Sequence, residues 1–383
     1  MPPSRRGKGG SQLVQAVPSP RRRGEKGERF KRIGMGSWLY LCRAASNLGW
    51  APSTGKANNR RGPGLRGHFQ SYLLIVAALW PFVTSNAWAK DVPRAPRFFF
   101  SGNGHLKLGH AHFNTTLDVQ YRRSDGSYDP AALQQIRHFF RSRGDDREHA
   151  MSLRLIELLS YVQQHYRPKK MVLLSGYRSP EFNAELGAAG QAVAMASLHT
   201  QGLASDIAFS GVDLRRLWLS LRELKTGGAG YYRKQNFLHI DTGPPRFWEE
   251  TTSRVGENLS AGNARMFVRT DFDRYEDLQG AVLSLQSVTT LPLRLASRAH
   301  VIDRRGGQML ELAPHGNIAS DGQCLTITTP AEAYELDVRS VASDKNLPGD
   351  PEAERPYIIV DTCEPRLERT PPQVRSNEIE VRR

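Results

Sequence analysis

Residues 197–206 read SLHTQGLASD, and this stretch decides how the first half of the ordered chain folds. We predict a loop carrying His199 that leads into a strand, Ala204–Phe209, carrying Asp206. Another strand, Asn236–Asp241, carries His239. Seven residues are enough for the loop to bring His199 back toward Asp206, and His239 completes a set of three polar side chains.

Two imidazoles and one carboxylate are the nitrogen and oxygen ligands that a catalytic zinc ion takes, with a further position open for water. Bound zinc lowers the pKa of that water to about 7 and polarises a carbonyl. Asp241 follows His239 by two residues on a strand, so both side chains point to the same face. Asp241 is therefore the candidate general base, or alternatively a group that orients a metal ligand.

The surrounding sequence predicts a mixture of helices and strands. Asp129-Pro130 is typical of a helix start, and apolar residues then recur at helical spacing. The predicted helices are one from Pro130, one near Ser152–His165, one from Pro180, and one over Asp213–Leu224. The predicted strands are Phe98–Phe100, Leu117–Tyr121, Met171–Leu174, Ala204–Phe209 and Asn236–Asp241. Turns are predicted at Ser124–Ser127 and Gly227–Gly230.

The formal net charge of +15 is concentrated at the N-terminus. Residues 1–89 contain 15 of the 53 Lys and Arg but only two of the 38 acidic residues, so 38 basic and 36 acidic residues remain in 90–383. This near-neutral remainder gives no electrostatic argument for a nucleic-acid partner.

Residues 1–89 are predicted to be a basic, disordered leader that ends in a signal peptide. The apolar segment 72–83, YLLIVAALWPFV, is too short to span a bilayer comfortably, and Ala87-Trp88-Ala89 suits signal peptidase. We expect cleavage after Ala89, no stable membrane span afterwards, and a periplasmic or cell-envelope location. The alternative is an uncleaved N-terminal anchor.

The C-terminal part of the chain follows a different pattern. Residues 255–365 contain short strand-like segments separated by Gly, Pro, Asn and Asp, which predicts a small β-rich domain of unknown role. Residues 366–383 are expected to be a loose tail. Cys324 and Cys363 lie in two of the strand-like segments, and an oxidising compartment makes a disulfide between them plausible, with two free buried thiols as the alternative.

The order of four motifs resembles a known family. SGYRS at 175–179, SLHTQGLASD at 197–206, GAGYY at 228–232 and NFLHIDTG at 236–243 look like the YcbK-like branch of the superfamily that contains zinc D-alanyl-D-alanine carboxypeptidases and the hedgehog domain. The resemblance covers roughly residues 105–248. It implies an α+β metallopeptidase domain over 95–250, with a small antiparallel sheet and flanking helices.

The resemblance also implies the roles of individual residues. His199, Asp206 and His239 match the zinc ligands, and Arg178 matches an arginine that faces the substrate in relatives. The implied activity is hydrolysis of peptide cross-links or stem peptides of bacterial peptidoglycan. One departure is Asn236, which stands where many superfamily members have the catalytic acid, so Asp241 is the natural substitute as base.

Two other interpretations remain open. Asn236 favours a non-catalytic, zinc-containing module that binds the cell wall. His239 and Asp241 could instead form an iron(II) site with His300 or His315, although this leaves His199 and Asp206 without a role. A further pair, His110 and His112, is interpreted as structural.

Overall fold

The computed structural model describes residues 96–189, 196–254, 257–315, 318–330, 334–342 and 347–382. All of these described residues belong to one compact unit. The predicted leader, with its apolar segment 72–83 and its cleavage site after Ala89, lies outside the described residues. Among the helices that are described, none is long and apolar enough to cross a membrane.

The first sheet has seven strands in the order β2-β1-β3-β4-β6-β5-β7. Four of its strand pairs are antiparallel, but β1 pairs with β3, and β5 with β7, in parallel. The predicted α+β class is confirmed, whereas the sheet is mixed rather than purely antiparallel. The strands are β1 (His105–His110), β2 (Thr116–Gln120), β3 (Lys170–Ser175), β4 (Ala204–Ser210), β5 (Gly228–Tyr232), β6 (Phe237–Asp241) and β7 (Arg246–Glu249).

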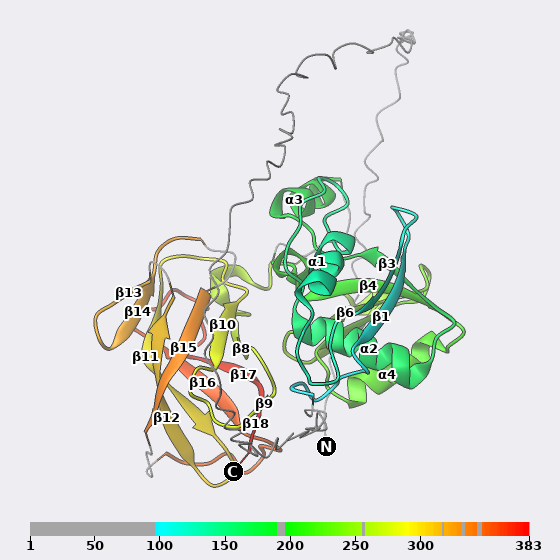
Figure 1. Cartoon of the computed structure of the whole chain (residues 1–383). Coiled ribbons are helices and arrows are strands. Elements are labelled where there is room, and N and C mark those ends of the chain that lie inside the picture. The colour runs from blue at the N-terminus through cyan, green and yellow to red at the C-terminus, as the bar shows by residue number, and fades with distance from the viewer. Residues whose placement is uncertain are drawn as a thin grey trace, which may run out of the picture. The chain divides into compact units, whose positions relative to one another are not determined.

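Four helices accompany this sheet, and three of them pack into one apolar core with it (Figure 1). They are α1 (Pro130–Phe139), α2 (Leu153–Tyr166), α3 (Pro180–Ala188) and α4 (Leu214–Glu223). Asp129 caps α1 as the sequence predicts, and Asp213 caps α4; in both cases a side-chain oxygen accepts backbone N–H groups. The core takes every second residue of the central strands, including Leu173, Ile207 and Ile240. Their alternate neighbours therefore face away from the helices.

Two local predictions in this half of the chain are wrong, and one strand is not predicted from the sequence. Phe98–Phe100 is not a strand, because the Phe99 N–H donates to the Asp273 carboxylate instead of to a neighbouring strand. Gly227–Gly230 is not only a turn, since Gly228 begins β5. A further strand, β7, follows β6 and pairs with β5.

The second sheet has nine strands and its own apolar core. Its strands are β8 (Phe267–Thr270), β10 (Val282–Gln286), β11 (Leu293–Ile302), β12 (Gly307–Pro314), β13 (Ala319–Ser320), β14 (Cys324–Ile327), β15 (Tyr334–Ala342), β16 (Tyr357–Thr362) and β17 (Gln373–Glu378). The β-rich character of this region and the disulfide between Cys324 and Cys363 are as predicted. Short 3-10 turns lie at Leu198–Gln201, Glu250–Thr252 and Ala261–Asn263.

The expected loose tail, residues 366–383, is ordered over its described part. β17 pairs with β16, and β18 (Glu380–Val381) pairs with β9 (Arg274–Tyr275). Val374 and Ile379 are almost completely buried in the core of the second sheet. Burial of these two apolar side chains outweighs the Arg- and Pro-rich composition that suggested a free tail.

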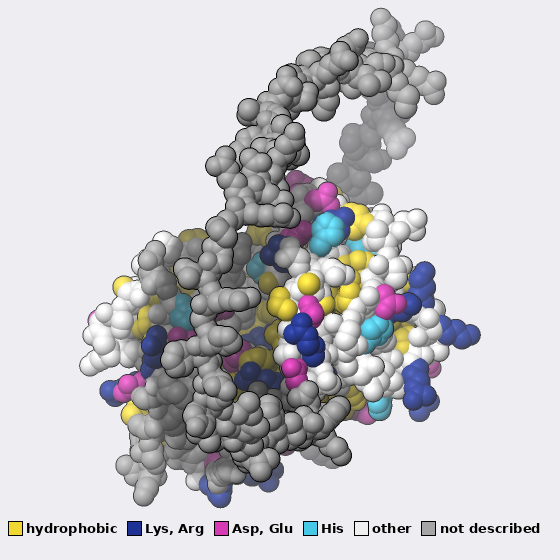
Figure 2. Space-filling model, in the orientation of Figure 1, with side chains coloured by type: hydrophobic (Ala, Val, Ile, Leu, Met, Phe, Trp, Pro, Cys, Tyr) yellow, Lys and Arg dark blue, Asp and Glu magenta, His cyan; other side chains and the backbone are white. Residues whose placement is uncertain are grey.

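On the face drawn in Figure 2, basic and acidic side chains of the described residues are interspersed. This distribution agrees with the near-neutral charge of the chain after residue 89. It offers no single-sign surface on that face of the described residues for a polyanion such as nucleic acid.

Glu157 of α2 ties the helix layer to the segment that follows β2. Its carboxylate is 0% exposed and accepts hydrogen bonds from Arg122 Nε (2.7 Å), Tyr121 Oη (3.0 Å) and Tyr128 Oη (3.1 Å). The buried charge is therefore fully paired, as the low dielectric of the interior requires.

We predict that Glu157→Ala lowers the free energy of unfolding by roughly 3–5 kcal/mol, because it leaves the buried Arg122 guanidinium unpaired. Urea unfolding followed by circular dichroism measures this. The matched control is Glu181→Ala, which breaks an exposed ion pair with Arg147 and is expected to cost less than about 1 kcal/mol. Equal effects of the two substitutions would contradict the prediction.

Candidate metal centre

The face of the first sheet that points away from the helices carries a cluster of polar side chains. Asp206 of β4 lies directly opposite His239 of β6 in the strand register. Ile207 and Ile240, one residue further along each strand, point to the core. Alternation along the two strands thus places the Asp206 and His239 side chains side by side on the open face.

His199 reaches the same place from the 3-10 turn that precedes β4. It is 2% exposed, and its Nδ1 lies 2.7 Å from the backbone oxygen of Gly176. A carbonyl oxygen only accepts hydrogen bonds, so Nδ1 carries the proton and Nε2 presents a lone pair to the cluster. The backbone N–H of Arg178 donates to the backbone oxygen of His199 at 3.2 Å, which fixes the 3-10 turn against the loop after β3.

Three atoms converge at the centre of the cluster. His199 Nε2 lies 3.2 Å from His239 Nδ1 and 3.3 Å from Asp206 Oδ1, and His239 Nδ1 lies 3.0 Å from the same oxygen. Ligand atoms about 2.0–2.1 Å from a tetrahedral zinc ion lie roughly 3.3 Å from one another. These separations therefore fit one metal ion, and this is a group of described residues that could hold one.

The second nitrogen of His239 identifies its tautomer. Nε2 lies 2.9 Å from Asp241 Oδ2, and a carboxylate accepts, so Nε2 donates. In neutral His239 the lone pair of Nδ1 then faces the lone pair of His199 Nε2 and the charged oxygen of Asp206. Three acceptors at this distance need a positive charge between them, and either a proton on His239 or a divalent ion provides it.

Burial and neighbouring charges set the protonation of these groups. Burial lowers the pKa of His199, and the nearby Arg178 charge lowers it further. Burial also opposes a charge on His239, but hydrogen bonds to Asp206 and Asp241 outweigh it and raise the pKa of His239. For Asp206, burial is outweighed by His199, His239 and Arg178, which hold its pKa well below its ordinary value. Asp206 is therefore a carboxylate at neutral pH.

Asp241 lies behind His239 and is 0% exposed. Oδ1 accepts from the backbone N–H groups of Gly228 (3.0 Å) and Gly243 (2.9 Å), and Oδ2 accepts from Arg246 Nη2 (2.7 Å) as well as from His239. Burial would raise the pKa of Asp241, but the Arg246 guanidinium, His239 and the Gly243 N–H together outweigh it and lower the pKa. All of its lone pairs are therefore occupied, and it remains charged.

Sequence reasoning missed four residues that contribute to this site. Arg246 of β7 neutralises Asp241, and Trp248 of the same strand lies with its ring 5.2 Å from the His239 ring. Gly228 and Gly230 make these approaches possible, because a Cβ at Gly228 would overlap the Asp241 carboxylate and one at Gly230 would overlap Trp248. The glycine-rich run was interpreted as a turn, so its place beside the last histidine was not visible.

Arg178, which the family resemblance places facing the substrate, also joins the cluster, where it contacts the carboxylate of Asp206. Nη2 donates to Asp206 Oδ2 at 2.7 Å, and Nε donates to Ser175 Oγ at 2.9 Å. The two oxygens of Asp206 are thus divided, with Oδ2 held by the guanidinium and Oδ1 turned to the histidines. All five residues singled out from the sequence, His199, Asp206, His239, Asp241 and Arg178, meet at one place.

The remaining histidines considered from the sequence lie elsewhere. His110 Nδ1 accepts the backbone N–H of His112, and the His112 ring contacts Arg143 at 2.7 Å. His300 lies on β11, and His315 pairs with Glu335 and Asp337 beside the second sheet. Neither His300 nor His315 joins His239 in the group of described residues that could hold a metal.

Comparison with known proteins identifies relatives of the first half of the chain. Residues 101–248 match the family described as Peptidoglycan L,D-endopeptidase MepK, Peptidase_M15_2. The MepK of Escherichia coli K12 is 35% identical over 144 residues, which cover 37% of this chain and 79% of the relative. A probable MepK of Haemophilus influenzae is 33% identical over 124 residues, covering 32% of this chain and 67% of the relative. No solved structure matches the chain significantly.

The matched range contains both strands and the loop that bring His199, Asp206 and His239 together, and it confirms the resemblance seen in the motifs. From its sequence and this match, the chain belongs to the Peptidase_M15_2 family of peptidoglycan L,D-endopeptidase MepK.

Proposed function

We propose that this protein is a zinc-dependent peptidase that hydrolyses peptide bonds of bacterial peptidoglycan. The observation that carries the proposal is the convergence of His199 Nε2, His239 Nδ1 and Asp206 Oδ1 at separations of 3.0–3.3 Å. The relatives are named as L,D-endopeptidases, which supports cleavage of an L,D cross-link rather than another bond of the same polymer.

His199, Asp206 and His239 are the proposed zinc ligands. When bound, zinc supplies a water of lowered pKa and a Lewis acid that polarises the scissile carbonyl. The chain's own contribution is orientation: the Gly176 oxygen fixes His199, and Arg178 fixes Asp206. Arg178 is only 14% exposed and is held by Asp206 and Ser175, so we assign it first to positioning that ligand.

For Asp241 we favour the orienting role over that of general base. A base must reach the attacking water and have a free lone pair, whereas this carboxylate is buried and accepts from His239, Arg246 and two backbone N–H groups. A carboxylate that accepts the second N–H of a ligating histidine fixes its tautomer and strengthens it as a ligand.

The proposed location is the periplasm or cell envelope, where peptidoglycan is found. The predicted signal peptide, with its apolar core at residues 72–83 and cleavage after Ala89, and the Cys324–Cys363 disulfide support export.

We predict that His199→Ala abolishes zinc binding and muropeptide release. Loss of several kcal/mol of transition-state stabilisation corresponds to a fall in activity of about a thousandfold or more. The measurements are zinc content, expected to fall from about one per chain, and mass spectrometry of fragments released from sacculi. His315→Ala, which removes an exposed histidine beside the second sheet, serves as the matched control.

Fragments that carry a cut L,D cross-link would support the proposed bond, and other fragments would identify a different one. Full release by the His199→Ala protein would reject the metal assignment. Zinc near one per chain together with binding to sacculi but no turnover in the unmodified protein would instead select the non-catalytic cell-wall module.

A second prediction separates the two roles of Asp241. If Asp241 orients His239, Asp241→Asn weakens zinc affinity by roughly 10- to 100-fold, and excess zinc restores most of the activity. If Asp241 is the general base, the variant keeps its zinc affinity and stays inactive at any zinc concentration. A competition titration with a zinc chelator, followed by activity at saturating zinc, distinguishes these outcomes.

A further inference from the structure

Arg269 of β8 is a buried cation without a carboxylate partner. It is 6% exposed, and its hydrogen bonds go to two hydroxyl oxygens, Thr242 Oγ1 at 2.6 Å and Ser152 Oγ at 3.4 Å. No ion pair joins it to any described acidic residue. A guanidinium stays protonated in proteins, and buried charges are normally paired because their desolvation is costly. The N–H groups of the Arg269 guanidinium therefore have no directly bonded anionic acceptor among the described residues.

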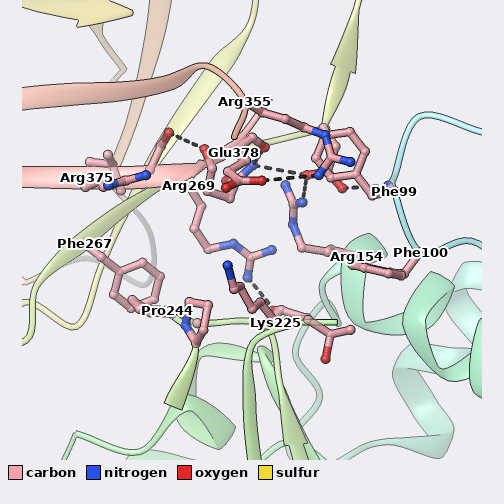
Figure 3. Close-up of a pocket in the computed structure, with 18 of the residues that line it drawn as sticks. Phe99, Phe100, Arg154, Lys225, Pro244, Phe267, Arg269, Arg355, Arg375 and Glu378 are labelled. Carbon is pink, nitrogen blue, oxygen red and sulfur yellow. Dashed lines mark hydrogen bonds and ion pairs between the residues drawn. The ribbon is translucent and has the colours of Figure 1, made fainter. Parts of the chain in front are cut away.

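Arg269 lines a cavity with a volume of about 770 Å³, which Figure 3 shows in close-up. Arg154 enters the same cavity from α2, and its Nε is a buried donor without a hydrogen-bond partner. Phe99, Pro244 and Phe267 provide apolar walls. A volume of this size with a few convergent polar groups is typical of sites for small organic ligands.

The other charges that line the cavity are largely balanced. Arg154 pairs with Asp273, Lys225 Nζ lies 3.2 Å from Glu354, and Arg355 Nη1 lies 3.3 Å from Glu378. Arg375 stacks on the Tyr357 ring at 3.4 Å and has no ion pair among the described residues. The remaining lining carboxylate, Glu223, is exposed. Arg269 and Arg375 are therefore the lining cations that form no ion pair with a described residue. The Asp241 carboxylate also attracts the Arg269 charge, but it is already bonded to Arg246 and His239.

We propose that this cavity binds the carboxylate end of a peptide, with Arg269 as its principal contact and Arg375 as a second. The planar guanidinium matches a carboxylate through two parallel hydrogen bonds. The apolar walls and the volume suit an organic chain behind the carboxylate, whereas a free inorganic anion leaves most of the space unfilled. The choice of a peptide rests on the proposed peptidoglycan substrate, while the need for an anion does not.

The cavity and the metal centre share one segment of backbone. Thr242, which accepts from Arg269, directly follows Asp241, and the Gly243 N–H donates to the Asp241 carboxylate. A peptide bound to Arg269 therefore lies next to Asp241, the residue that orients His239. This places the site close to the metal cluster without using its ligands.

Isothermal titration of the full chain with acetyl-D-Ala-D-Ala tests the proposal, with the C-terminal amide of the same dipeptide and inorganic phosphate as parallel probes. We expect the free acid to bind, the amide to bind at least about tenfold more weakly, and phosphate to bind more weakly than the acid. Arg269→Met should weaken binding of the acid by about 10- to 100-fold, since it removes a charge-assisted pair of hydrogen bonds. Arg298→Met, which removes an exposed arginine of β11, should leave binding unchanged.

Arg375→Met keeps the test decisive if Arg269→Met does not fold. Arg375 is exposed, so its substitution should not prevent folding, and its loss should still weaken binding of the free acid several-fold. The same titration on the His199→Ala protein separates this site from the metal centre. Unchanged binding there supports the cavity, even if the chain proves not to be a peptidase. Loss of binding in His199→Ala, equal binding of acid and amide, or full binding by both arginine variants would overturn the proposal.

Discussion

The pairing of β4 with β6 is the constraint on which the metal centre depends. In this register Asp206 lies opposite His239, and both side chains leave the sheet on the face away from the helices. A slip of one residue would turn one of them into the core and bring an isoleucine to the open face. The register is fixed because Ile207, Leu238 and Ile240 are completely buried on the other side. The apolar core thus determines the geometry of the polar cluster.

The two buried carboxylates of the cluster are each neutralised by a separate arginine. Arg178 holds Asp206, and Arg246 holds Asp241, so each buried carboxylate has its own guanidinium. The two histidines have different hydrogen-bond acceptors. The neutral Gly176 carbonyl accepts from His199, and the charged Asp241 carboxylate accepts from His239. Burial and the Arg178 charge lower the pKa of His199, whereas the Asp206 and Asp241 carboxylates outweigh burial and raise the pKa of His239.

The sequence predicted features that depend on local patterns. The helix start at Asp129, the strands β4 and β6, and the pairing of Cys324 with Cys363 follow from capping, alternation and composition. Features that depend on distant contacts were not predictable. Gly228 and Gly230 are glycines because Asp241 and Trp248 approach them, and the tail is ordered because Val374 enters a core built by other strands. No short window of sequence contains either reason.

The family match ends at residue 248, whereas Arg269 and Arg375 lie in the following β-rich region. Two arginines nevertheless join that region to helix α2 and to the residue after β6, since Arg154 of α2 donates to the Thr270 oxygen and Arg269 donates to Thr242. Packing alone does not require a buried guanidinium at position 269, because a neutral side chain of similar size would avoid its desolvation cost. A buried guanidinium that forms no ion pair with a described residue at such a junction is better explained by a ligand that supplies a directly bonded anion. The second sheet then contributes to recognition, in addition to covering one side of the peptidase fold.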